Sequence, residues 1–116
     1  ELNAMRIPGV RFDATTRAGA ASAAKWGGQT IPMIRLTVTD RNALNPTVAT
    51  LRLLQVIRAR HPNELQWRES IDRLFGSERA KRAVDAGEAA VTALIADIAR
   101  ESREFERATR AYHLYR

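Results

Sequence analysis

Apolar and polar residues alternate in two short stretches near the N-terminus of this 116-residue chain. The stretches cover residues 9–15 and 33–39, and an alternation with a period of two is typical of a strand with one buried side. We therefore predict two strands and expect their apolar sides to be buried. The apolar positions are Val10, Phe12 and Ala14 in the first stretch, and Ile34, Leu36 and Val38 in the second.

The spacing of apolar residues changes to every third or fourth position after Pro46, which predicts a helix over residues 46–60. Asn45 is a favoured N-cap residue, and proline suits the first helical position because its missing donor would be unpaired there. The His61-Pro62 pair ends the helix, since a residue before proline disfavours the α conformation.

Three further helices are predicted downstream, over residues 70–75, 78–86 and 88–110. Gly76 and Gly87 follow the first two as helix-ending glycines. The last helix carries an apolar stripe that extends as far as Phe105. The order of elements predicts a single α+β domain, in which a small sheet of two or three strands packs against about four helices.

The connection between the strands, residues 16–30, is long for a compact domain, and such loops are often functional. It contains Lys25 and Trp26, and the tryptophan either anchors the loop or stacks on a flat ligand such as a sugar. The second strand carries Arg35 and ends at Asp40 and Arg41. Asp40 either ties the turn through backbone amides or borders a binding cleft, and Arg41 either neutralises Asp40 or reaches a ligand.

The chain offers few residues for catalysis or metal binding. It has no cysteine and two isolated histidines, and it lacks a G-x-S-x-G elbow and a phosphate-binding loop. Most of its carboxylates lie on predicted helices among arginines, where they pair along the helix surface. We therefore expect no catalytic residue, no metal site and no cofactor within this chain.

The net charge is +6, and nearly all of the positive charge is arginine. Such a balance suits a small basic nucleic-acid-binding module, which stays open as an alternative function. Against it, the sequence lacks a basic strand interleaved with aromatic residues and a recognition helix with clustered arginines. It also lacks an apolar run long enough to cross a membrane.

Several segments occur in the order found in one bacterial family. They are "IPGVRF", "WGGQ", "IRLTVTDRNALNP", "RARHP", "LQWR", "IDRLFGSERAKRAVDAGE" and "EFERATRAYHLY". In this order they resemble the C-terminal domain of the peptidoglycan exo-β-N-acetylmuramidases, formerly a domain family of unknown function. The chain departs from the commoner family form at two places. Ala14-Thr15-Thr16 stands where that form has Phe-Thr-Pro, and Thr30-Ile31-Pro32 stands where it has Cys-Gly-Gly.

The resemblance implies that a Rossmann-like N-terminal domain of the same chain carries the catalytic carboxylate, with the cleft between the two domains. It implies a parent glycoside hydrolase, periplasmic or secreted, that removes N-acetylmuramic acid from peptidoglycan fragments during cell-wall recycling. This chain would then be an auxiliary domain that forms part of the cleft; a purely structural docking domain is the remaining alternative. The expected substrate-binding residues are Lys25, Trp26, Arg35, Asp40 and Arg41.

Overall fold

A computed structural model describes residues 1–20 and 26–113, and Lys25 lies outside these described residues. The chain divides into two compact units, Glu1–Ala49 and Thr50–Arg116, and each unit is described by itself. One contains a two-stranded antiparallel sheet and the other is helical, which confirms the α+β class. None of the helices in the described part of the chain is long and apolar enough to cross a membrane.

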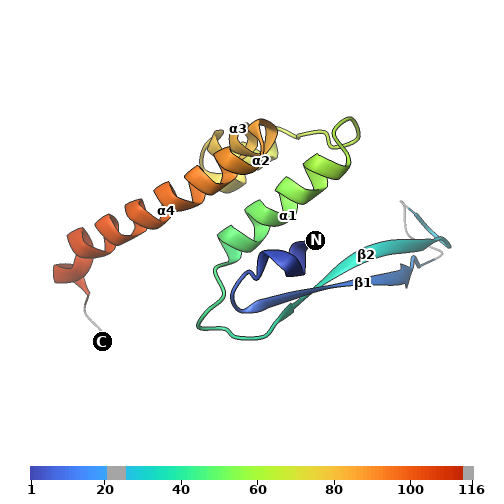
Figure 1. The fold of residues 1–116 in the computed structure, drawn as a ribbon, viewed down its shortest axis with the longest axis horizontal. Coiled ribbons are helices and arrows are strands. Elements are labelled where there is room, and N and C mark those ends of the chain that lie inside the picture. Colours follow the sequence, from blue (N-terminus) through green and yellow to red (C-terminus); the bar gives the residue numbers. More distant parts are fainter. Residues whose placement is uncertain (21–25, 114–116) are drawn as a thin grey trace. The chain divides into compact units, whose positions relative to one another are not determined.

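The first unit is built on a hairpin of two long strands (Figure 1). β1 (Val10–Ala18) pairs with β2 (Thr30–Val38) in a register that runs from Val10 opposite Val38 to Ala18 opposite Thr30. Both strands extend further toward the connecting loop than the alternation indicated. The prediction of a loop over residues 16–30 was therefore wrong at both ends, because the backbone ladder continues where the side-chain pattern fades.

A short 3-10 turn, η1 (Leu2–Met5), is fastened to the middle of β1 by one side chain. The Asn3 amide nitrogen donates to the Phe12 carbonyl oxygen at 2.7 Å, and the Phe12 backbone N–H donates to the Asn3 amide oxygen at 2.9 Å. This pair of bonds imitates the ladder of a neighbouring strand. It places the beginning of the chain directly beside β1.

The apolar side of β2 is not buried, contrary to the expectation from its alternation. Ile34, Leu36 and Val38 are 48%, 45% and 45% exposed. On the partner strand β1, by contrast, Phe12 is buried, although it stands opposite Leu36 in the ladder. A period of two establishes which residues share a side of a strand, but it does not establish that the chain supplies a cover for that side.

The helical unit contains most of α1 (Pro46–Arg60) and all of α2 (Ser70–Phe75), α3 (Arg79–Ala86), α4 (Glu88–Thr109) and the 3-10 turn η2 (Arg110–Tyr112). The predicted starts of α1 and α4 are confirmed. The Asn45 side-chain oxygen accepts the Val48 N–H at 3.1 Å, as an N-cap should. A buried cluster joins α1, α3 and α4; it consists of Leu51, Ala80, Ala83, Val84, Val91 and Leu94.

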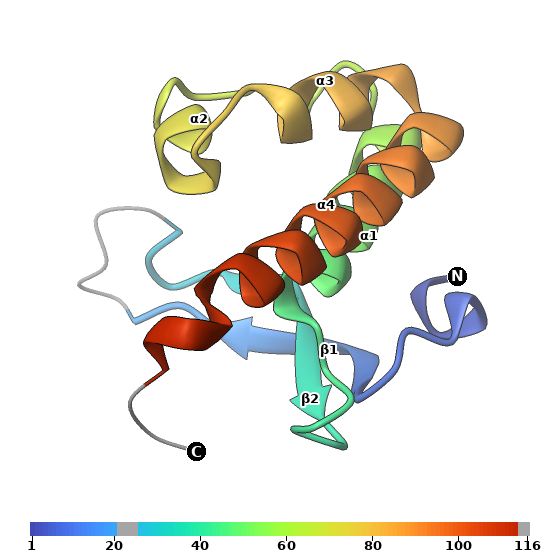
Figure 2. The ribbon, with the colours of Figure 1, turned by 90° about the vertical axis from the view of Figure 1, so that its left-hand side faces the viewer.

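α3 packs against α4, and the C-terminal half of α4 continues past α2 and α3 (Figures 1 and 2). Phe105 lies in that half and is 70% exposed, although it continues the apolar stripe of the helix. The helical period is kept along α4, but no described element of the helical unit covers its last turns. Val91 and Leu94, in the half beside α3, are buried.

Arg58, at the C-terminal end of α1, organises the connection between α1 and α2. Its guanidinium group donates to the carbonyl oxygens of Pro62 and Leu65 at 2.9 and 3.0 Å. It also pairs with Asp85 and lies 5.4 Å from the centre of the Trp67 ring. The Trp67 indole N–H donates to the same carboxylate. The network joins Arg58 to residues four to twenty-seven positions away in the sequence.

Candidate functional site: two ends of the hairpin

The corner after β2 is a hydrogen-bonded turn centred on Asp40. One carboxylate oxygen accepts the backbone N–H groups of Asn42 and Ala43, at 2.8 and 3.3 Å. The Gly9 carbonyl oxygen accepts the N–H of Thr39 at 2.9 Å, which ties the start of β1 to the corner. These bonds use the side chain of Asp40 to hold the backbone, so they favour the turn interpretation of this residue.

Gly9 allows the close approach of the two chain segments at this corner. Its backbone has φ +74°, and a Cβ atom would clash with the Asp40 carbonyl oxygen and the Leu44 backbone nitrogen. Any residue but glycine would therefore be both strained and too large here. The corner is a fixed structural feature, and it projects Arg41 outward.

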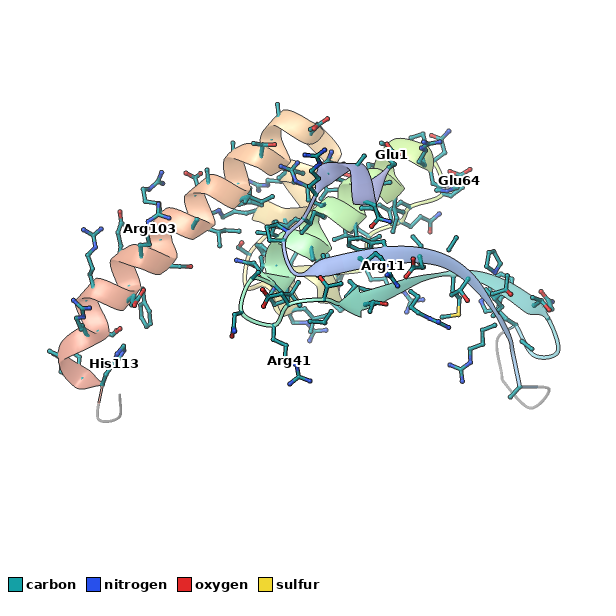
Figure 3. All side chains as sticks on the ribbon, turned by 60° about the horizontal axis from the view of Figure 1, so that its bottom comes forward. Glu1, Arg11, Arg41, Glu64, Arg103 and His113 are labelled. Atoms are coloured by element: carbon teal, nitrogen blue, oxygen red, sulfur yellow. The ribbon has the colours of Figure 1, made fainter. Side chains whose placement is uncertain are left out.

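Arg41 is exposed, and its side chain extends away from the ribbon (Figure 3). Within residues 1–20 and 26–113 it forms no hydrogen bond or ion pair that would hold it at Asp40. The alternative in which Arg41 only neutralises Asp40 therefore finds no support in the geometry. Its guanidinium group is available to a ligand or a partner.

The opposite end of the hairpin contains Trp26. Its backbone has φ +64°, an uncommon conformation for a residue with a bulky side chain, and its ring is largely exposed. The turn is held by bonds from the Gln29 N–H to the Trp26 carbonyl oxygen at 3.2 Å and from the Gly19 N–H to the Gln29 carbonyl oxygen at 2.8 Å. An uncommon backbone conformation held by its neighbours is a feature of many binding sites.

A depression of about 250 Å³ lies on the hairpin near this end. Arg35 contributes to it from β2, and Arg17 contributes a second guanidinium group from β1. Two threonines and two apolar residues complete the lining. The full set is Thr15, Thr16, Arg17, Met33, Ile34 and Arg35. Two arginines in one depression suit an anion such as a carboxylate, which a guanidinium group can bind through two hydrogen bonds.

The hairpin separates the residues that the sequence grouped into one site. Arg35 lies with Arg17 in the depression, and Trp26 lies in the loop beyond it. Asp40 and Arg41 lie past the other end of β2, on the order of 15 Å from Arg35 along an extended chain. Arg17 was missed, because the predicted first strand ended at Thr15; the alternation Arg11, Asp13, Thr15, Arg17 would have indicated it.

The described residues provide no cluster of histidine, aspartate and glutamate side chains that could bind a metal ion. The helical unit has a separate cavity of about 430 Å³, lined by Arg103, Glu106, Arg107 and Arg110. The resolved pKa shifts also belong to that unit. A hydrogen bond from Arg79 lowers the pKa of Glu101, and the same bond raises the pKa of Arg79. This exposed pair joins α3 to α4 and has no reactive group beside it.

The fold and the hairpin thus define a small α+β domain that presents an arginine-containing depression on a two-stranded sheet. The chain belongs to the family of C-terminal domains of the exo-β-N-acetylmuramidase NamZ, whose family model matches residues 1–115. No curated protein and no solved structure matches the chain significantly. The family match covers both units, and at the level of the family it connects the chain with glycoside hydrolysis of peptidoglycan.

Proposed function

We propose that this chain is an auxiliary domain of an exo-β-N-acetylmuramidase that acts on peptidoglycan fragments outside the cytoplasm. The observation that carries the proposal is the family match over residues 1–115. In the proposed enzyme the catalytic carboxylate belongs to a Rossmann-like domain that precedes this one in the same chain. The present domain supplies one wall of the cleft and does not hydrolyse the substrate alone.

The substrate-binding part of the proposal rests on the depression in the hairpin. N-acetylmuramic acid differs from other N-acetylhexosamines by its lactyl carboxylate, so an anion site is what distinguishes it. Arg35 and Arg17 line one depression, which suits that carboxylate. Trp26 offers a flat apolar surface to the sugar ring, and Lys25 stays a proposed contact. Asp40 shapes the corner, where Arg41 is a second, independent contact.

A chromogenic β-N-acetylmuramide tests both parts of the proposal. The 116-residue chain alone should give no turnover, and the full-length enzyme should cleave the substrate. In that enzyme Arg35→Ala should raise KM by about tenfold or more, which corresponds to one lost charge-assisted hydrogen bond. Arg11→Ala is the matched control. Arg11 lies on the same side of the sheet but outside the depression, where it pairs with Asp13 at 3.1 Å.

The carboxylate is tested separately with a substrate whose lactyl group is a methyl ester. If Arg35 binds the carboxylate, the ester should be a poor substrate of the wild-type enzyme, and Arg35→Ala should not weaken it further. An equal loss on both substrates would show that Arg35 acts in some other way. An Arg41→Ala variant with unchanged KM would remove Arg41 from the set of contacts.

The rival function, a nucleic-acid-binding module, makes a different prediction for the isolated chain. Its binding to DNA or RNA would be tight at low salt and would weaken steeply as salt is added. A filter-binding titration that finds no complex near physiological salt removes this rival.

A further inference from the structure

We propose that Arg35 and Arg17 bind two different carboxylates of one ligand, a peptidoglycan strand with N-acetylmuramic acid at its end and again two sugars further along. Arg35 binds the lactyl carboxylate of the terminal residue, and Arg17 binds that of the second one. This inference rests on the proposed function and deepens it, because it gives the two arginines separate partners and identifies the substrate as an oligosaccharide.

The register of the hairpin sets the spacing of the two arginines. Arg35 stands opposite Asp13, and Arg17 follows Asp13 by four positions on β1, so both arginines lie on the same side of the sheet. At about 3.4 Å per strand residue, their Cα atoms are about 14 Å apart along the hairpin. The pair formed by Thr15 and Met33 lies between them in the depression. Two cations at the two ends of one depression suit two anions better than one.

Both guanidinium groups are available to a ligand. Within residues 1–20 and 26–113, neither Arg17 nor Arg35 forms a hydrogen bond or an ion pair through its side chain. Asp13 stands opposite Arg35, but its carboxylate pairs with Arg11 at 3.1 Å. One guanidinium group can bind both oxygens of a carboxylate. A ligand with a single carboxylate would therefore leave the second arginine unpaired, whereas a ligand with two would neutralise both.

The chemistry of the polymer supplies a second carboxylate in a suitable place. In peptidoglycan, N-acetylmuramic acid alternates with N-acetylglucosamine, and only the muramic acid carries a lactyl carboxylate. Alternate sugars of an extended β-1,4-linked strand face the same side, as the two arginines do on the sheet. Successive carboxylates are one disaccharide unit apart, and the long, flexible side chains of Arg17 and Arg35 can adjust to that separation.

The connections of the hairpin decide which arginine binds the terminal sugar. β1 begins and β2 ends at the base of the hairpin, where the neighbouring parts of the chain are joined, and Arg35 is closer to this base than Arg17. The proposed catalytic carboxylate belongs to a neighbouring domain, so we place the scissile bond toward the base. An exo-acting enzyme cleaves next to the terminal sugar, and the rest of the strand then extends past Arg17 toward the tip.

Two trisaccharides that differ only in their third sugar test the second carboxylate. Both begin with N-acetylmuramic acid followed by N-acetylglucosamine. The third sugar is N-acetylmuramic acid in the first and N-acetylglucosamine in the second. We expect the full-length enzyme to cleave the first with a kcat/KM about tenfold higher, the effect of one charge-assisted hydrogen bond at an exposed site. Chromatography of the released terminal sugar measures both rates.

Variants of the arginines connect this preference with the proposed contacts. Arg17→Ala should remove the preference, and Arg17→Lys should restore part of it, because lysine keeps the charge but not the planar group. Arg35→Ala should weaken the cleavage of both trisaccharides and keep the preference, because both carry the terminal carboxylate. Arg11→Ala is the matched control and should keep the preference, since Arg11 lies on the same side of the sheet outside the depression.

The outcomes separate this inference from the proposed function. Equal kcat/KM values of the wild-type enzyme for the two trisaccharides, or a preference that survives in Arg17→Ala, would keep the function and overturn the inference. A protein that cleaves neither trisaccharide would refute the function. Calorimetric binding of the same trisaccharides then decides the inference: tighter binding of the first that depends on Arg17 keeps it, and equal binding overturns it.

Discussion

Replacement of Arg58 by methionine should be among the most damaging single changes in the helical unit. Methionine keeps the length and the apolar stem of the side chain but removes every donor and the charge. The Arg58 side chain is 20% exposed, so solvent replaces its bonds only in part. The carbonyl oxygens of Pro62 and Leu65 lose their donor, Asp85 loses its cation, and Trp67 loses the group that stacks on it.

The magnitude follows from these contacts. The two hydrogen bonds to carbonyl oxygens contribute about 1 kcal/mol each, and the stacking on Trp67 contributes about 0.5–1 kcal/mol. The ion pair contributes at most about 1 kcal/mol, because the Asp85 carboxylate is 42% exposed and solvent screens it. The Nε atom of Arg58 is buried without a partner in the described part of the chain, which reduces the net value. We expect a loss of about 3 kcal/mol, less than the simple sum because the groups share partners.

Urea denaturation followed by tryptophan fluorescence measures this loss. Trp67 reports on the network directly, and a Trp26→Phe background removes the signal from the hairpin. With an m-value typical of a small protein, the midpoint should fall by about 2 M. Arg82→Met is the matched control, because Arg82 is 77% exposed and pairs with Glu78 one helical turn away; its effect should stay within about 0.5 kcal/mol.

An Arg58→Met variant as stable as the Arg82→Met variant would refute this reasoning, since it would show that water replaces the network at no cost. Arg58→Lys separates charge from geometry. Lysine retains the positive charge but lacks the planar group that reaches two carbonyl oxygens and a carboxylate at once. The Arg58→Lys variant should therefore be less stable than the wild type and more stable than the Arg58→Met variant.

Three further outcomes are expected. Asp40→Ala should lower the free energy of unfolding by about 1 kcal/mol, the value of a lost turn or cap bond, measured by thermal denaturation. The hydrogen bond from Arg79 lowers the pKa of Glu101 in the folded state. The stability that this bond adds is therefore fully present above pH 4.5, the ordinary pKa of the group, and is lost as the pH falls through the lowered pKa. Glu101→Gln should flatten this part of the pH–stability profile. Val91→Ala should cost about 2 kcal/mol, whereas Phe105→Ala on the same helix should cost less than about 1 kcal/mol, because Val91 is fully buried and Phe105 is not.

The helices were predictable because their ends carry local chemical signals. Asn45 and Pro46 begin α1, and Gly76 and Gly87 end α2 and α3 with positive φ angles of 81° and 100°. These signals act through backbone geometry within one turn, so the sequence alone contains them. The Arg58 network was not predictable in the same way. It joins groups separated by up to twenty-seven positions, and their meeting depends on how α1 and α3 pack.

The candidate site was only partly predictable for a similar reason. Arg35 and Trp26 were recognised as chemically capable residues, but Arg17, which lines the same depression, was not. The register places Arg17 opposite Ile31 and Arg35 opposite Asp13, so the two arginines lie on the same side of the sheet without being a cross-strand pair. Register depends on the length of the loop and on backbone pairing along the whole hairpin. The sequence predicted the strands individually and left their register open, so it could not show that both arginines line one depression.

The wrong expectation of burial on β2 and the exposure of Phe105 on α4 have the same physical cause. Ile34, Leu36 and Val38 keep the strand period, and Phe105 keeps the helical period, yet all four are exposed. In the buried part of α4 the cover comes from α1 and α3, so the pattern and the burial agree. On β2 and in the last turns of α4, no described element of the same unit packs on the apolar residues. These residues keep the strand or helical period but remain exposed. A periodic apolar pattern therefore establishes which residues share a side of an element, and burial requires in addition that another element covers that side.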